Sequence, residues 1–173
     1  MTGSDDCTSP KRIEFTQALP FDIIEGQKAG WTVYISIQTL EETKRAATAI
    51  AAVLRAGDVL LLDGPMGTGK TTLAAMIAEA LGCEGAASSP TFSIAQQYDG
   101  PLPVWHLDLY RLEQEDLYDI GYEDYFYPEE AVTLIEWPDR AGALLPKNAL
   151  RIEFQTNPRK LRIDDRLQER VNR

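Results

Sequence analysis

Residues 59–81 read VLLLDGPMGTGKTTLAAMIAEAL and place a glycine-rich loop between two apolar segments. The continuous apolar run 59–62 is typical of a strand covered on both faces of a parallel sheet. Apolar residues at helical spacing follow from Thr72 to Leu81, just before Gly82. The order strand, glycine loop, helix predicts that this stretch forms the centre of an α/β domain.

The glycine loop satisfies the pattern G-x-x-x-x-G-K-[ST] in the strand-to-helix context that the pattern requires. Glycines let the backbone curl so that successive N–H groups point inward, and the positive end of the following helix faces the same anion. Lys70 adds a charge for the β- and γ-phosphates, and the Thr71 hydroxyl is suited to ligate Mg²⁺. We therefore expect the phosphates of ATP or ADP to bind at Gly64, Pro65, Met66, Gly67, Thr68, Gly69, Lys70, Thr71 and Thr72.

Two acidic residues end later apolar strands. Asp108 follows the run 104–107, and Glu136 follows the run 132–135. Both should emerge at the carboxyl edge of the sheet, where ligands bind in open α/β folds. A phosphate-binding glycine loop of this type, or P-loop, needs an acid at this edge for the metal or its waters. The candidate catalytic residues are therefore Lys70, Asp108 and Glu136. The candidate metal ligands are Thr71, Asp108 and Glu136. For each acid taken alone, a solvated strand end is the alternative.

Strands and helices alternate along most of the chain. We expect strands at 31–37, 59–62, 92–98, 104–109 and 132–137, and an antiparallel pair at 149–154 and 160–163. The first helix is expected to begin at Leu40 and to be stopped by Gly57. Two further helices are expected at 72–81 and 113–125, with a loop at 83–91. This order predicts a three-layer, P-loop NTPase-like α/β fold with a mainly parallel sheet and a C-terminal antiparallel hairpin.

Composition limits the domain count and the partners. A chain of 173 residues with 44% hydrophobic residues is sized for one domain. We expect a flexible extension at 1–30, an ATPase domain at 31–164 and a charged, fraying tail at 165–173. The net charge of −10 argues against independent nucleic-acid binding. Two distant cysteines, no apolar run near roughly 20 residues and no basic leader predict a cytoplasmic protein without a membrane segment.

Further motifs follow the P-loop in a fixed order. They are Ser89-Pro90-Thr91-Phe92, then HLDLYRL at 106–112, then Ile135-Glu136-Trp137. Together with Gly57-Asp58 before the P-loop, this set resembles the TsaE (YjeE) ATPases of bacterial tRNA threonylcarbamoyladenosine (t6A) biosynthesis over residues 31–164. The P-loop alone is widely shared, whereas SPTF, H-x-DLYRL and EW in this order are specific to that family.

The resemblance implies roles for individual residues. Lys70 and Thr71 look like the phosphate lysine and the magnesium ligand, Asp108 like a Walker-B-type aspartate, and Glu136 like a second catalytic or metal-linked acid. Thr91 resembles a switch residue that senses the γ-phosphate. The resemblance also implies an ATPase that switches its contacts with the TsaD and TsaB proteins. That complex threonylcarbamoylates adenosine 37 in tRNAs reading codons that begin with A, so this chain meets tRNA only indirectly.

Several residues keep two interpretations. His106, the only histidine, lies in an apolar strand, which favours a hydrogen-bonded structural histidine over a general base. Trp137 either orders Glu136, contacts a partner or packs at a strand end, and Arg111 either stabilises transferring phosphate or pairs with nearby acids. The C-terminal basic residues either face tRNA or an acidic partner or are simply solvated: Lys147, Arg151, Arg159, Lys160 and Arg162.

A small-molecule kinase is the alternative function, because P-loop chains of this length often phosphorylate metabolites. Such kinases need an arginine-rich lid and an acceptor pocket that exclude water, and the sequence carries neither signal. A GTPase switch is disfavoured as well, because the sequence contains no Asn-Lys-x-Asp element.

Overall fold

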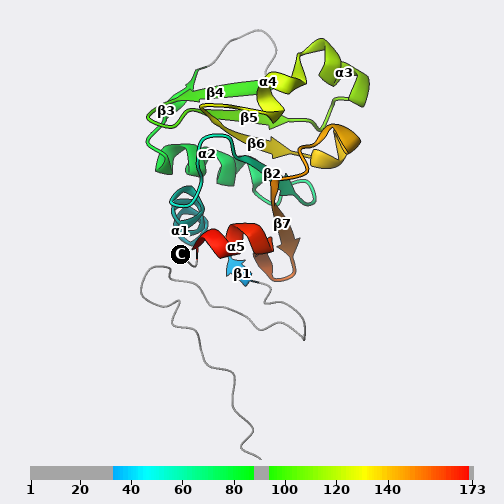
Figure 1. The fold of residues 1–173 in the computed structure, drawn as a ribbon. Coiled ribbons are helices and arrows are strands. Elements are labelled where there is room, and N and C mark those ends of the chain that lie inside the picture. Colours follow the sequence, from blue (N-terminus) through cyan, green and yellow to red (C-terminus); the bar gives the residue numbers. More distant parts are fainter. Residues whose placement is uncertain (1–32, 88–93, 172–173) are drawn as a thin grey trace, which may run out of the picture.

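The computed structural model describes residues 33–87 and 94–171, and within them the strands form one eight-stranded sheet (Figure 1). The strand order is β1-β8-β7-β2-β6-β5-β4-β3. The strands are β1 (Val33–Ser36), β2 (Val59–Asp63), β3 (Glu84–Ala87), β4 (Ala95–Asp99), β5 (Val104–Asp108), β6 (Val132–Glu136), β7 (Leu150–Thr156) and β8 (Arg159–Ile163). The helices are α1 (Leu40–Ala51), α2 (Lys70–Ala80), α3 (Gln114–Asp119), α4 (Tyr122–Phe126) and α5 (Asp165–Val171), with short 3-10 turns at Pro138–Arg140 and Gly142–Leu144.

The sheet is parallel at its centre and antiparallel towards both edges. β7, β2, β6 and β5 form three parallel pairs, whereas the four outer pairs are antiparallel. The predicted α/β class and the C-terminal hairpin of β7 and β8 are confirmed, but the prediction of a mainly parallel sheet is wrong. Short connections join β3 to β4, β4 to β5 and β7 to β8, and a connection of this kind allows only antiparallel pairing.

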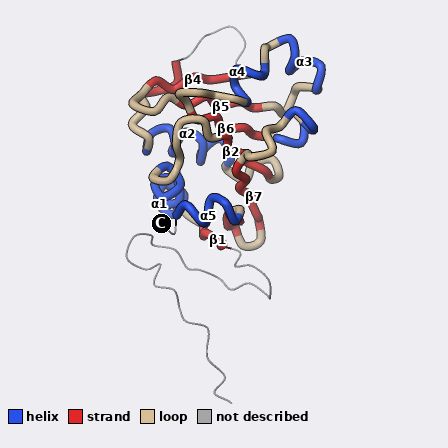
Figure 2. The backbone as a smooth tube through the Cα atoms, in the orientation of Figure 1, coloured by secondary structure: helices blue, strands red, loops and turns tan. Residues whose placement is uncertain are grey.

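Helices cover both faces of the sheet. Along β2, Leu60 and Leu62 belong to one buried cluster, which includes Leu73 and Ile77 of α2. Leu61 belongs to a second cluster that contains residues of α3 and α4. Figure 2 shows the helices in blue on either side of the strands in red. The central strands are therefore buried on both faces, as their continuous apolar sequence predicted.

The start of α1 follows its sequence signal, but its end does not. The Thr39 hydroxyl accepts a hydrogen bond from the Glu42 amide at 3.1 Å, and the Glu42 carboxylate accepts one from the Thr39 amide at 3.3 Å. This reciprocal pair is the predicted capping box. The helix ends at Ala51 rather than just before Gly57. Two turns then lead from the helix to β2.

Two internal segments also differ from the predictions. The expected helix 113–125 is divided into α3 and α4 because Gly121 adopts a left-handed φ of 67°. The first part of the expected loop 83–91 is β3, which extends the sheet by pairing with β4.

Residues Asp165–Val171 form the helix α5, where the sequence predicted a fraying charged tail. Asp164 accepts a hydrogen bond from the Leu167 amide at 2.8 Å, and the Leu167 side chain is fully buried. Arg170 pairs with Asp58 just before β2. The buried side chain of Leu167 and the ion pair of Arg170 therefore attach this helix to the domain.

None of the helices in the described part of the chain has the length and apolar character that a membrane crossing requires.

Candidate functional site

The glycine-rich loop connects β2 to α2 and packs closely against β7. Gly64 has a φ of 146°, and a Cβ built on it would lie 2.7 Å from the Cβ of Phe154. Gly67 has a φ of 76°, and nothing lies within 4 Å of the position of its missing Cβ. Gly64 thus allows a close approach of two backbones, whereas Gly67 allows a turn that faces open space.

Lys70 begins α2 and turns its side chain back under the loop. Its residue is only 4% exposed, and Nζ donates hydrogen bonds to the carbonyl oxygens of Gly64 at 2.7 Å and Pro65 at 2.8 Å. Burial lowers the pKa of Lys70, although the charges of Glu136 and Asp108 oppose that shift. No ion pair to this ammonium is found among the described residues. An anion entering the site would therefore meet a buried cation with no tight ionic partner.

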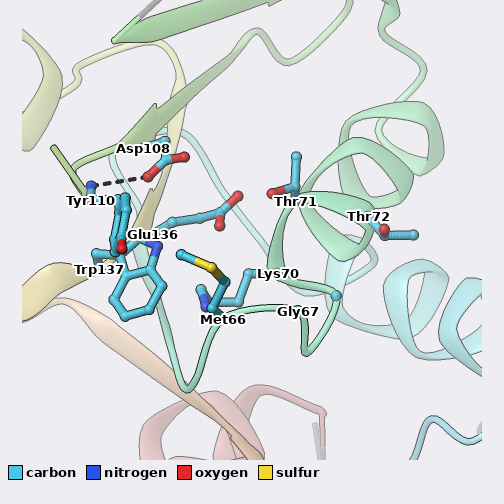
Figure 3. Close-up of a pocket in the computed structure, with 10 residues that line it drawn as sticks. Met66, Gly67, Lys70, Thr71, Thr72, Asp108, Tyr110, Glu136 and Trp137 are labelled. Carbon is cyan, nitrogen blue, oxygen red and sulfur yellow. Dashed lines mark hydrogen bonds between the residues drawn. The ribbon is translucent and has the colours of Figure 1, made fainter.

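A cavity of about 340 Å³ opens between the loop and the ends of β5 and β6 (Figure 3). This volume is in the range of sites that hold small molecules. Its walls are Met66, Gly67, Gly69, Lys70, Thr71, Thr72, Asp108, Tyr110, Glu136 and Trp137. The fold thus brings the predicted phosphate loop and both predicted acids to one site.

Asp108 and Glu136 lie side by side at the carboxyl edge of the sheet. β5 and β6 are parallel, and these two residues are register partners. Glu136 is 3% exposed, and its Oε1 lies 2.8 Å from Nε2 of His106. Asp108 is exposed and accepts a hydrogen bond from the Tyr110 amide at 3.0 Å. The prediction that both acids emerge at this edge is confirmed.

The buried Glu136 carboxyl remains ionised. Burial raises the pKa of Glu136, but the hydrogen bond from His106, the nearby Thr71 hydroxyl and the charge of Lys70 outweigh burial and hold it below the ordinary carboxyl value. Figure 3 shows its carboxylate extending towards Thr71. A hydroxyl and an ionised carboxylate in this arrangement present hard oxygen atoms to the cavity.

Trp137 and Tyr110 form an aromatic wall beside the acids. Trp137 has a left-handed φ of 57°, which is uncommon for a residue other than glycine. Its ring centroid lies 4.9 Å from that of Tyr110 and 4.0 Å from Nζ of Lys70. The sequence placed Trp137 near Glu136 but assigned Tyr110 no role, although Tyr110 stands inside the HLDLYRL motif.

Three predicted phosphate residues belong to the loop without lining the cavity. Gly64 and Pro65 offer their carbonyl oxygens to Lys70, and the buried Thr68 hydroxyl donates to the Pro65 carbonyl at 2.9 Å. These residues stabilise the conformation of the loop through hydrogen bonds on the side away from the cavity. The predicted switch residue Thr91 lies outside the described residues.

The open interpretations of other residues are resolved in part. His106 is buried and hydrogen-bonded, as expected. Arg111 is exposed, and no ion pair to it occurs in the described part of the chain. Several basic groups of the C-terminal hairpin are engaged within the molecule: Arg151 with Asp63, Arg162 with Glu153, Arg159 with the Thr68 carbonyl and Lys160 with the Tyr34 ring.

The donor set fits a magnesium ion that is shared with phosphate groups. Within residues 33–87 and 94–171, no cluster of three or more His, Cys, Asp or Glu could hold a metal ion by itself. The cavity instead offers one hydroxyl, from Thr71, and two carboxylates, from Asp108 and Glu136. Mg²⁺ typically takes one or two carboxylates and completes its shell with phosphate oxygens and waters.

Comparisons with known proteins identify one family. The family profile described as "Threonylcarbamoyl adenosine biosynthesis protein TsaE" matches residues 37–163. A TsaE protein of Bacillus subtilis is 44% identical over 113 residues, which cover 65% of this chain and 70% of the relative. A TsaE protein of Treponema pallidum is 34% identical over 119 residues, covering 68% of this chain and 87% of the relative. A crystal structure of Bacillus subtilis YdiB aligns with a TM-score of 0.65 at 32% identity, covering 82% of this chain and 94% of that one. The chain belongs to the TsaE family of threonylcarbamoyl adenosine biosynthesis proteins.

Proposed function

We propose that this chain is a Mg²⁺-dependent ATP hydrolase that acts as a switch on the TsaD–TsaB complex. ATP binding and hydrolysis change its contacts with that complex and so enable repeated threonylcarbamoylation of adenosine 37 in tRNAs that read codons beginning with A. The chain does not itself transfer the threonylcarbamoyl group, and it meets tRNA only through the complex. The ATPase domain comprises the predicted residues 31–164 together with α5, which packs on them, and the protein works in the cytoplasm.

The observation that carries this proposal is the meeting of a buried cation and two acids in one cavity. Nζ of Lys70 makes its hydrogen bonds to two backbone carbonyl oxygens, and phosphate oxygens would be stronger acceptors because they are charged. Thr71, Asp108 and Glu136 stand opposite and supply the oxygens that Mg²⁺ requires. Residues Gly64 to Thr72 hold the phosphates in this proposal, and Thr91 senses the γ-phosphate.

Glu136 and Lys70 have separate roles in the proposed reaction. Water attacks the γ-phosphate in line, and Lys70 and the loop amides neutralise the charge that develops. A Mg²⁺ ion held by Thr71, Asp108 and Glu136 would add positive charge at the phosphates. Glu136 aligns the metal or the attacking water. We expect the isolated protein to turn over slowly, because many NTPase switches reach their full rate only when a partner completes the site.

Hydrolysis assays with and without the partners test the proposal. ATP hydrolysis is measured with and without Mg²⁺ for this protein alone, with the TsaD–TsaB pair, and with a panel of small phosphate acceptors. Slow Mg²⁺-dependent turnover that rises strongly only with the pair supports the switch. Stimulation by an acceptor that becomes phosphorylated would instead identify a kinase, and the absence of hydrolysis under every condition would overturn the enzyme assignment.

Lys70→Ala tests the phosphate site directly. A hydrogen bond to a charged group is worth about 1.5–3 kcal/mol, so the dissociation constant for ATP should rise roughly 10- to 100-fold. Lys44→Ala is the matched control, because Lys44 is an exposed lysine of α1 that pairs with Glu79 away from the cavity. Calorimetric titration with ATP measures both affinities, and equal affinity in the two variants would contradict the assigned site.

A further inference from the structure

His106 is a buried polar residue that lies behind the cavity rather than in its wall. It comes from β5 and is 4% exposed, and it is not among the residues that line the cavity. Its Nε2 lies 2.8 Å from Oε1 of Glu136 on the neighbouring strand β6, and both side chains are 4% exposed. The imidazole therefore contacts the acid from the side opposite to the solvent.

The direction of this hydrogen bond follows from the chemistry of the two groups. An ionised carboxylate only accepts hydrogen bonds, so Nε2 of His106 carries the proton and donates it. Nδ1 of His106 is buried and has no hydrogen-bond partner in the part of the chain that the structure describes. A proton on Nδ1 would be a buried donor without an acceptor, which costs about 1–3 kcal/mol. A proton on Nε2 is therefore the arrangement that suits this environment.

Among the described residues, no other polar group is hydrogen-bonded to the imidazole. The nearest aromatic partner, Tyr98, has its ring centroid 6.4 Å from that of His106, and its hydroxyl donates to the side chain of Gln96 at 3.1 Å. His106 thus keeps one unsatisfied nitrogen in an apolar strand in order to make one hydrogen bond. An apolar residue would avoid that cost, so the hydrogen bond to Glu136 is the feature that offsets it.

We propose that His106 is a positioning residue for Glu136. Its Nε2–H holds one carboxylate oxygen at the back of the site, which leaves the other oxygen to face Thr71 and the cavity (Figure 3). A free glutamate side chain has three rotatable bonds, and fixing it before the reaction removes that freedom from the barrier. This inference rests on the proposed ATPase function, because it assigns His106 a task only through Glu136.

Two substitutions separate positioning from packing. His106→Leu keeps a side chain of similar bulk but removes the donor, whereas His106→Gln keeps an N–H donor near the place of Nε2. With the TsaD–TsaB pair, we expect His106→Leu to lower kcat by about 10- to 100-fold, the range typical of groups that orient a ligand. The KM and Kd for ATP should stay within about 2-fold of wild type, since His106 does not line the cavity. His106→Gln should recover most of kcat.

A double-mutant cycle with Glu136→Gln gives the decisive readout. If His106 acts only through the Glu136 carboxylate, adding His106→Leu to Glu136→Gln should lower single-turnover hydrolysis no further. If the double variant hydrolyses ATP more slowly than Glu136→Gln alone, by the factor that His106→Leu costs in the wild type, the inference is overturned. It is also overturned if His106→Leu alone has the kcat of wild type. If His106→Leu has that kcat while Glu136→Gln is inactive, the proposed function remains intact. Absence of hydrolysis by the wild type would instead be the failure of the proposed function itself.

Discussion

The ends of β5 and β6 look alike in the sequence but differ in the structure. Each strand is apolar and ends on an acid, and Asp108 and Glu136 are register partners on neighbouring parallel strands. Yet Asp108 is exposed and accepts a hydrogen bond from its own loop, whereas Glu136 is buried and held by His106. Two residues with the same sequence signature therefore occupy different electrostatic environments.

The difference comes from the position of each strand in the sheet. β6 lies between β2 and β5, so the end of β6 faces the glycine-rich loop that leaves β2. Lys70, Thr71 and Trp137 enclose Glu136 from that side. β5 has β4 as its other neighbour, and β4 runs antiparallel to it. Among the described residues, the central acid is thus buried, while the outer acid is exposed.

The largest effect is expected from Glu136→Gln, which keeps the shape of the side chain and removes its charge. Loss of a fixed charge or donor at the reacting group typically costs on the order of 10²- to 10³-fold in kcat. The Kd for ATP should change little, because Lys70 and the loop amides remain. Steady-state hydrolysis with the TsaD–TsaB pair measures the effect, and Glu115→Gln on the exposed face of α3 is the matched control. Turnover at the control rate would remove Glu136 from the reaction.

Asp108→Asn should have a smaller effect of a different kind. Asp108 is exposed, so waters can replace part of what its charge provides to a metal ion. We expect about a 10-fold loss at low Mg²⁺ that is partly recovered at high Mg²⁺, within the range seen when groups around a metal are changed. A titration of hydrolysis against Mg²⁺ measures this. If Asp108→Asn resembled Glu136→Gln at every Mg²⁺ concentration, the contrast between the two acids would have no functional meaning.

Local patterns in the sequence predicted the parts of the site that depend on neighbouring residues. The loop from Gly64 to Thr72 lies between a strand and a helix because its glycines and the apolar runs around it act within a few residues. The cap at Thr39 formed for the same reason. The carboxyl ends of β5 and β6 met because parallel strands point the same way.

Features that depend on distant partners were missed. The burial of Glu136 and its hydrogen bond with His106 depend on which strands become neighbours, and strand order is set by pairing across the whole chain. The segment from Asp165 reads as a charged tail, yet Leu167 fills a place in the core that no local pattern reveals. A helix of seven residues gains its stability from such packing rather than from its own composition.

The smallest effect concerns acid stability and tests the buried half of the comparison alone. His106, Thr71 and Lys70 hold the pKa of Glu136 below its ordinary value of 4.5. As the pH falls below about 4.5, the unfolded chain therefore takes up this proton before the folded protein does. The contribution of the carboxylate is fully present above pH 4.5 and is lost as the pH falls through the folded pKa.

Urea unfolding between pH 7 and pH 3 compares wild type with Glu136→Gln, which has no proton to bind at this position. The free energy of unfolding should decline more steeply with acid in the wild type. The extra loss, summed over the whole pH range, is about 1.4 kcal/mol for each unit by which the folded pKa lies below the unfolded one. Only the slopes are compared, because the substitution also changes the stability at neutral pH. Parallel curves would mean that the groups around Glu136 do not favour its charged form. The contrast with Asp108 would then be one of burial and not of charge.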